Sequence, residues 1–122
     1  MARVLVIDDD LQLRKLLCKI LINDDHEVYD AANGIEALEL IERLPLDLVV
    51  TDIFMPGEDG LGTIMGISKN FPQIKIIAMT GGGSVKDVDF LKLASNLGAK
   101  KVFQKPIDMA VFLATVNDLL QE

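Results

Sequence analysis

The sequence is poor in cysteine and in long apolar runs, and each shortage excludes a class of protein. The one cysteine, Cys18, has no second cysteine for an internal disulfide and no nearby histidine pair for zinc, so we interpret it as a helix residue rather than a reactive thiol. No apolar stretch approaches the ~20 residues that a membrane-spanning helix needs. Met1-Ala2-Arg3 leads into a strand-like run rather than a signal peptide. We therefore expect a cytoplasmic protein that does not enter a membrane.

Basic residues and large aromatic residues are also scarce. Twelve Lys and Arg residues stand against 19 Asp and Glu residues, giving a net charge of -7, and Lys100-Lys101 is only a pair. Direct binding of nucleic acid by this domain is not expected, because that binding depends on basic residues that neutralise phosphates. With no Trp and one Tyr, the chain also lacks an apparent stacking pair for a flavin.

Short apolar runs alternate with helix-like patterns along the whole chain. Its 122 residues, half of them hydrophobic, suit one domain over 1–122. The patterns predict strands near 3–8, 27–31, 47–52, 74–79 and 101–104, and helices near 11–23, 34–43, 60–69, 85–97 and 108–121. Alternating strands and helices of this kind favour a doubly wound α/β fold with a parallel sheet.

Four of the predicted strands end on polar or charged residues. Asp8-Asp9 follows the first strand, Asp52 ends the third, Thr80 follows the fourth, and Lys105 follows the fifth. Because the carboxyl ends of parallel strands share one edge, three carboxylates, a hydroxyl and an ammonium are expected in one crevice. This combination predicts a site for a divalent cation and a phosphoryl group.

The acidic residues carry the predicted chemistry. Carboxylates about 4 Å apart repel by roughly 4 kcal/mol per pair at an effective dielectric constant near 20, so a cation or proton must neutralise them. Magnesium suits the task, because it prefers oxygen ligands and is commonly shared between carboxylates and a phosphate. Asp10 fits a simpler role as the cap of the first helix. Asp52 is interpreted as a nucleophile that Lys105 keeps ionised; the alternative is that it begins a polar turn.

The motifs at these strand ends resemble, in order and spacing, those of the receiver domain of two-component response regulators. The single-domain chemotaxis regulator is the best-known relative. The resemblance covers essentially the whole chain and rests on Val6-Ile7-Asp8-Asp9-Asp10, Asp52-Ile53-Phe54-Met55-Pro56-Gly57-Glu58-Asp59-Gly60, Met79-Thr80-Gly81, Gly98-Ala99 and Lys105-Pro106-Ile107.

The resemblance implies a flavodoxin-like five-stranded sheet of order 2-1-3-4-5 with five helices, and a set of roles. Asp52 accepts a phosphoryl group from a phosphohistidine of a sensor histidine kinase or phosphotransfer protein. Asp8, Asp9, Asp52 and the backbone carbonyl of Phe54 hold Mg2+. Thr80 and Lys105 bind the phosphoryl oxygens, and the bond after Lys105 is typically cis. Such a domain is a phosphoacceptor that assists its own phosphotransfer and dephosphorylation rather than a conventional enzyme.

Three positions depart from the family pattern. Val102 stands where the family usually has an aromatic switch residue, and Phe103 is expected on the opposite face of the strand. Phe54 and Gly82 stand where other members place side chains that orient the hydrolytic water. We therefore expect slow or ordinary self-dephosphorylation.

The fourth helix carries more apolar residues than one buried stripe requires, which fits either a broad buried face or a docking surface. In the family, the surface around the fourth helix, fifth strand and fifth helix binds an output partner or a second receiver, so a homodimer linked to phosphorylation stays open. A phosphatase working through an aspartyl-phosphate and a flavodoxin-like cofactor binder are the alternative functions. The phosphatase would normally need a second carboxylate at the position of Phe54.

Overall fold

The structure of the chain is a computed structural model that describes residues 2–54, 59–81 and 85–122, with the side chains of 85–88 left undescribed. The strands are β1 Arg3–Ile7, β2 Glu27–Ala31, β3 Leu48–Asp52, β4 Lys75–Thr80 and β5 Lys101–Gln104. The helices are α1 Leu11–Asn23, α2 Gly34–Arg43, α3 Gly60–Asn70, α4 Val85–Leu97 and α5 Met109–Leu120. Every predicted element is present, with boundaries that move by at most one residue.

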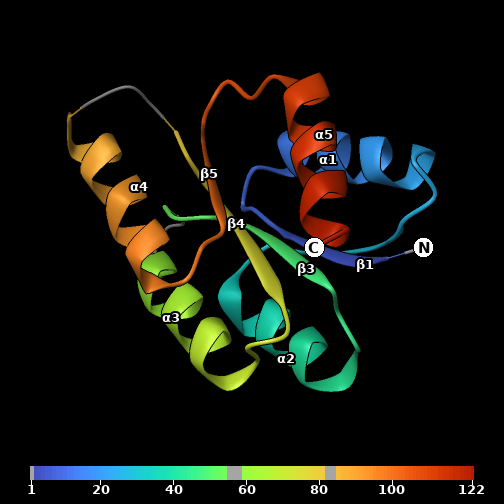
Figure 1. The fold of residues 1–122 in the computed structure, drawn as a ribbon, viewed down its shortest axis with the longest axis horizontal. Helices are drawn as coiled ribbons and strands as arrows, with labels where there is room; N and C mark the ends of the chain where they lie inside the picture. The colour runs from blue at the N-terminus through green and yellow to red at the C-terminus, as the bar shows by residue number, and fades with distance from the viewer. Residues whose placement is uncertain (1, 55–58, 82–84) are drawn as a thin grey trace.

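The strands of the described residues form one parallel sheet in the order β2-β1-β3-β4-β5. Helices α1 and α5 cover one face, and α2, α3 and α4 cover the other, as Figure 1 shows. The predicted doubly wound, flavodoxin-like fold with order 2-1-3-4-5 is confirmed. The carboxyl ends of β1, β3, β4 and β5 therefore lie along one edge of the sheet.

Strand side chains alternate between the two helical layers, which explains why the strands read as unbroken apolar runs. In β1, Val4 and Val6 pack with α1 and α5, whereas Leu5 and Ile7 pack with α2, α3 and α4. These four side chains are fully buried. The central strands β1, β3 and β4 bury side chains on both faces, whereas the edge strands β2 and β5 are mostly half-buried or exposed.

Side chains at the helix starts fix where the helices begin. Asp10 caps α1, as predicted, because its carboxylate accepts hydrogen bonds from the backbone N–H groups of Gln12 and Leu13. Asp108 caps α5 in the same way, so α5 begins one residue later than predicted. The Lys105–Pro106 peptide bond is cis, as the family resemblance implied.

No helix in the described parts of the chain has both the length and the apolar character needed to cross a membrane.

Candidate functional site

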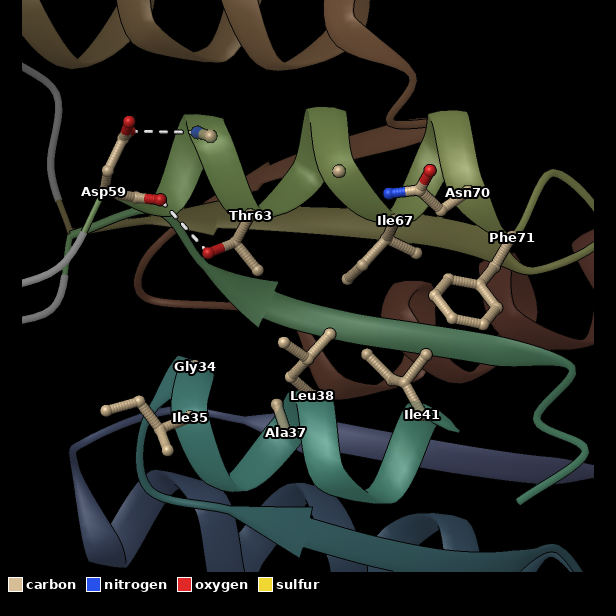
Figure 2. Close-up of a pocket in the computed structure, with 12 residues that line it drawn as sticks. Gly34, Ile35, Ala37, Leu38, Ile41, Asp59, Thr63, Ile67, Asn70 and Phe71 are labelled. Carbon is tan, nitrogen blue, oxygen red and sulfur yellow. Dashed lines mark hydrogen bonds between the residues drawn. The ribbon is translucent and has the colours of Figure 1, made fainter. Parts of the chain in front are cut away.

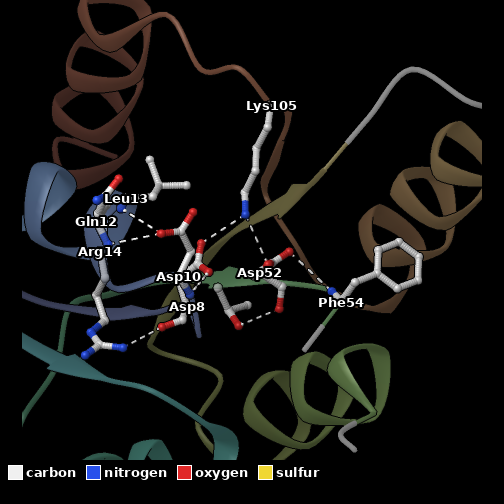
Figure 3. A network of polar contacts seen from close by, with 9 residues as sticks. Asp8, Asp10, Gln12, Leu13, Arg14, Asp52, Phe54 and Lys105 are labelled. Atoms are coloured by element: carbon white, nitrogen blue, oxygen red, sulfur yellow. Dashed lines mark hydrogen bonds and ion pairs between the residues drawn. The ribbon is translucent and has the colours of Figure 1, made fainter. Parts of the chain in front are cut away.

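Residues from three strand ends meet at the carboxyl edge of the sheet. Asp8 follows β1 and is fully buried, and Asp52 ends β3 with 4% of its surface exposed. Lys105 follows β5, and its Nζ lies 3.1 Å from Oδ2 of Asp8 and 3.1 Å from Oδ2 of Asp52. Figure 3 shows the lysine reaching down between the two carboxylates. The sequence predicted that these groups would meet, but it paired Lys105 with Asp52 alone.

Backbone N–H groups orient both buried carboxylates. Oδ1 of Asp8 accepts a hydrogen bond from the N–H of Asp10 at 2.9 Å, and Oδ1 of Asp52 accepts one from the N–H of Phe54 at 3.2 Å. Each carboxylate thus uses one oxygen for the backbone and the other for Lys105. The two side chains are held in fixed orientations before any ligand binds.

A third carboxylate, that of exposed Asp9, completes an acidic group. Within the described residues, Asp8, Asp9 and Asp52 each offer one carboxylate oxygen, and these oxygens lie within 4.8 Å of one another. When ionised, the three carboxylates and the ammonium of Lys105 leave two negative charges uncompensated. Hard oxygen donors with this residual charge fit a divalent cation such as Mg2+.

Burial and charge act together on the ionisation of the site. The pKa of Asp52 is raised above its ordinary value, chiefly because burial disfavours the carboxylate and further because Asp8 is negative; Lys105 and the Phe54 N–H oppose the shift. Burial by itself would lower the pKa of Lys105, but the two carboxylates reverse that effect, and the net shift is upward. The lysine therefore stays positively charged at neutral pH, and a bound cation would favour ionised Asp52.

Thr80 is the last residue of β4 and is fully buried. Its backbone carbonyl accepts a hydrogen bond from the N–H of Lys105 at 2.8 Å, which joins the ends of β4 and β5. Thr80 thus lies beside Lys105 along the carboxyl edge of the sheet, as the sequence predicted. Gly82, one of the departures from the family pattern, lies outside the described residues.

Strand β5 has no aromatic side chain at position 102, where the family usually has its aromatic switch residue. Val102 is 37% exposed. Phe103 instead packs edge-on against Phe112 of α5, with ring centroids 5.9 Å apart, inside the layer formed with α1 and α5. The expectation that Phe103 points to the other face of β5 is confirmed.

Apolar side chains lie exposed on α4, β5 and α5. They are Leu93 on α4 at 47%, Val102 on β5 at 37% and Val111 on α5 at 51%. In Figure 1, β5 runs between α4 and α5. Other apolar residues of α4, Leu91 and Ala94, are buried. The sequence left open whether the apolar residues of α4 form a broad buried face or a docking surface. Among the side chains described, Leu91 and Ala94 form a buried stripe, and Leu93 faces solvent.

A groove between α2 and α3 lies apart from this site, and the sequence did not predict it. Its volume is about 570 Å³, and Figure 2 shows apolar side chains of α2 facing α3 across it. Ile35 and Leu38 are exposed on its α2 side, and Gly66 on its α3 side has open space where a Cβ would stand. None of the acidic residues of the strand-end group lines it.

Sequence comparison places the chain beside known signalling proteins. The family model for the response regulator receiver domain matches residues 4–117. Sporulation initiation phosphotransferase F from Bacillus subtilis (strain 168) is 31% identical over 107 residues, covering 88% of this chain and 84% of that protein. Transcriptional regulatory protein GlrR from Escherichia coli (strain K12) is 31% identical over 121 residues, covering 99% of this chain. The chain spans only 27% of the length of GlrR.

Structural comparison agrees with the sequence matches. The beryllofluoride-activated receiver domain dimer of NtrC4, solved in solution, has a TM-score of 0.89 and 33% identity. The alignment covers 99% of this chain and 98% of that one.

Proposed function

Because the chain belongs to the response regulator receiver domain family of two-component systems, we propose that it is a phosphoacceptor module over residues 1–122 and that Asp52 carries the phosphoryl group. The observation that carries the proposal is the geometry of Asp52. Its buried carboxylate lies at the end of a strand, is oriented by the N–H of Phe54 and contacts the ammonium of Lys105. A receiver domain is a signalling domain, and this arrangement suits transfer of a group onto the protein itself.

The donor in this proposal is a phosphohistidine of a sensor histidine kinase or a phosphotransfer protein. An oxygen of the Asp52 carboxylate attacks phosphorus, forming an acyl phosphate as the bond between phosphorus and the imidazole nitrogen breaks. The donor histidine leaves neutral after taking a proton from water. Transfer of this kind depends mainly on positioning and on neutralising charge.

The acidic group is the proposed metal site. Asp8, Asp9, Asp52 and the backbone carbonyl of Phe54 would hold Mg2+, and the donor oxygens of the three side chains support this assignment. The ion when bound would screen the charge that builds up on the phosphoryl oxygens.

Lys105 and Thr80 are the proposed partners of the phosphoryl oxygens. Lys105 already lies 3.1 Å from Asp52, so its ammonium can follow the negative charge from the carboxylate to the phosphoryl group. The product carries more negative charge than the carboxylate it replaces. The hydroxyl of Thr80 would donate a hydrogen bond to that group, which makes Thr80 the residue that senses phosphorylation.

The proposed output surface consists of the exposed residues Leu93, Val102 and Val111. It would bind an output partner, an effector domain or a second copy of the chain after phosphorylation. Two relatives support these options: the NtrC4 receiver is a dimer in its beryllofluoride-activated form, and GlrR is a longer transcriptional regulatory protein.

The proposed phosphoryl group is expected to have a slow or ordinary lifetime. Phe54 has an apolar side chain and Gly82 has no side chain, so neither residue offers a polar side-chain group that could orient water for hydrolysis. The measurement is loss of phosphoryl label in Mg2+ without any phosphatase. A half-life of seconds would contradict this expectation.

Incubation with acetyl phosphate and Mg2+, followed by measurement of the intact mass, tests the function. We expect wild type to gain one phosphoryl group and Asp52→Asn to gain none. Glu39→Gln, which removes an exposed carboxylate of α2, is the matched control and should react like wild type. A wild-type chain that stays unmodified by every small-molecule phosphodonor and by a phosphohistidine protein would refute the proposal.

A further inference from the structure

One aromatic pair joins α4 to the loop that follows Asp52. The ring of Phe54 meets the ring of Phe90 edge to face, with centroids 4.7 Å apart and planes at 83°. Phe54 follows β3 and Phe90 belongs to α4, so the contact bridges two elements that are 36 residues apart in sequence. Edge-to-face packing at this distance is the favourable geometry for two aromatic rings.

Phe54 thus has two contacts that point in different directions. Its backbone N–H donates to Oδ1 of Asp52 at 3.2 Å, while its side chain extends toward α4, as Figure 3 shows. Phe54 is 41% exposed, and its contact with the ring of Phe90 restrains where its own ring lies. One residue therefore contacts both the phosphoacceptor, through its backbone N–H, and α4, through its ring.

The fifth strand offers no comparable connection. Val102 has no ring, and the ring of Phe103 is engaged with Phe112 in the layer on the far side of the sheet. Among the described residues, the aromatic pair formed by Phe54 and Phe90 connects the site to α4.

We propose that Phe90 is a positioning residue that acts through Phe54, so that this aromatic pair couples the orientation of Asp52 to the position of α4. The inference rests on the proposed function, because it concerns how Asp52 is oriented and how phosphorylation of Asp52 changes the position of α4. Phosphorylation that moves the Phe54 backbone moves the ring and with it α4, and a partner that holds α4 holds Phe54 in return.

The expected size of the coupling follows from the contact. Edge-to-face aromatic pairs change an equilibrium constant by about 2- to 12-fold beyond the area that they bury. Replacing Phe90 by Leu should keep apolar volume at that position but remove the ring. We expect the rate of phosphorylation by acetyl phosphate to change by a factor in this range. The amide NMR shifts of α4 on addition of a phosphoryl mimic should fall by a similar factor.

The test uses beryllofluoride with Mg2+ as the phosphoryl mimic and amide NMR as the readout. In wild type, the amides near Asp52 and those of α4 should shift together on addition of the mimic. In Phe90→Leu the amides near Asp52 should still shift, while the shifts of α4 shrink. Phe90→Tyr restores the ring at this partly exposed position and should restore the response.

Phe71→Leu is the matched control, because it makes the same substitution at the end of α3, away from Asp52. It should leave both sets of shifts and the phosphorylation rate as in wild type. If Phe90→Leu responds like wild type in α4 and in rate, the coupling is refuted while the phosphoacceptor role of Asp52 stands. If wild type responds to neither the mimic nor acetyl phosphate, the proposed function fails and the inference fails with it.

Discussion

Replacing Asp52 by Asn should stabilise the fold when no divalent cation is present. At an effective dielectric constant of 20, a carboxylate oxygen 4.8 Å away repels Asp52 by about 3.5 kcal/mol, and both Asp8 and Asp9 lie within that distance. The ammonium of Lys105 at 3.1 Å attracts it by about 5.4 kcal/mol. The two repulsions exceed the attraction by about 1.5 kcal/mol on this basis.

The exposure of Asp9 lowers this net repulsion of Asp52, and the burial of Asp52 adds to the destabilisation that its charge causes. Asp9 is exposed, so water screens its repulsion, while the variant also loses the cost of burying a charge at position 52. The Asn side chain keeps an oxygen that can accept from the N–H of Phe54. We expect a gain of about 1–2 kcal/mol, which corresponds to a rise in Tm of about 5 °C for a domain of this size.

The gain should depend on pH with a defined sign. The raised pKa of Asp52 means that the folded protein binds this proton more readily than the unfolded chain. Wild type therefore loses stability as pH rises through the folded pKa of Asp52. The advantage of Asp52→Asn is full above the folded pKa of Asp52 and disappears below the ordinary carboxyl value of 3.8.

Thermal unfolding followed by far-UV circular dichroism is the assay, because the chain has no Trp. Both proteins are measured in EDTA and again in saturating Mg2+, where binding should stabilise wild type and remove the advantage of the variant. Glu39→Gln should change the free energy of unfolding by no more than about 0.5 kcal/mol. A lower Tm for Asp52→Asn than for wild type in EDTA at pH 7 would refute the electrostatic reasoning.

Four further predictions concern single residues. Burial raises the pKa of the Cys18 thiol to about 11, so iodoacetamide at pH 8 should alkylate the folded protein much more slowly than the guanidinium-unfolded chain; equal rates would contradict this. Gly60→Ala places a Cβ in a severe clash with the backbone carbonyl of Ile53 and should cost more than about 2 kcal/mol in urea unfolding. Gly66→Ala, with open space at its Cβ, should instead be neutral or stabilising by up to about 1 kcal/mol. Lys105→Met should slow phosphorylation by acetyl phosphate about a hundredfold, and an unchanged rate would argue against its role.

The sheet and its polar edge could be predicted from the sequence because they depend on local patterns. Apolar runs that end on Asp8, Asp52 and Thr80 identify both the strands and the edge where they stop, and the family resemblance supplies the strand order. The observed helix boundaries differ from the predicted ones by at most one residue; α5, for example, begins after its cap Asp108 rather than at it. These features are set by neighbours along the chain.

Contacts between distant elements could not be predicted in the same way. The sequence pairs Lys105 with Asp52 but does not indicate that its ammonium also reaches Asp8. The packing of Phe54 on Phe90 and the groove beside Ile35 depend on how far each helix lies from the sheet and from its neighbours. No periodicity in the sequence encodes that spacing.

The central claim is that Asp52 accepts a phosphoryl group, and mapping of the modified residue tests it most directly. The protein is treated with acetyl phosphate and Mg2+, reduced with borohydride to trap the acyl phosphate as homoserine, digested and sequenced by mass spectrometry. The account predicts conversion at Asp52 alone. Conversion at Asp8 or Asp9 with Asp52 unchanged would contradict it.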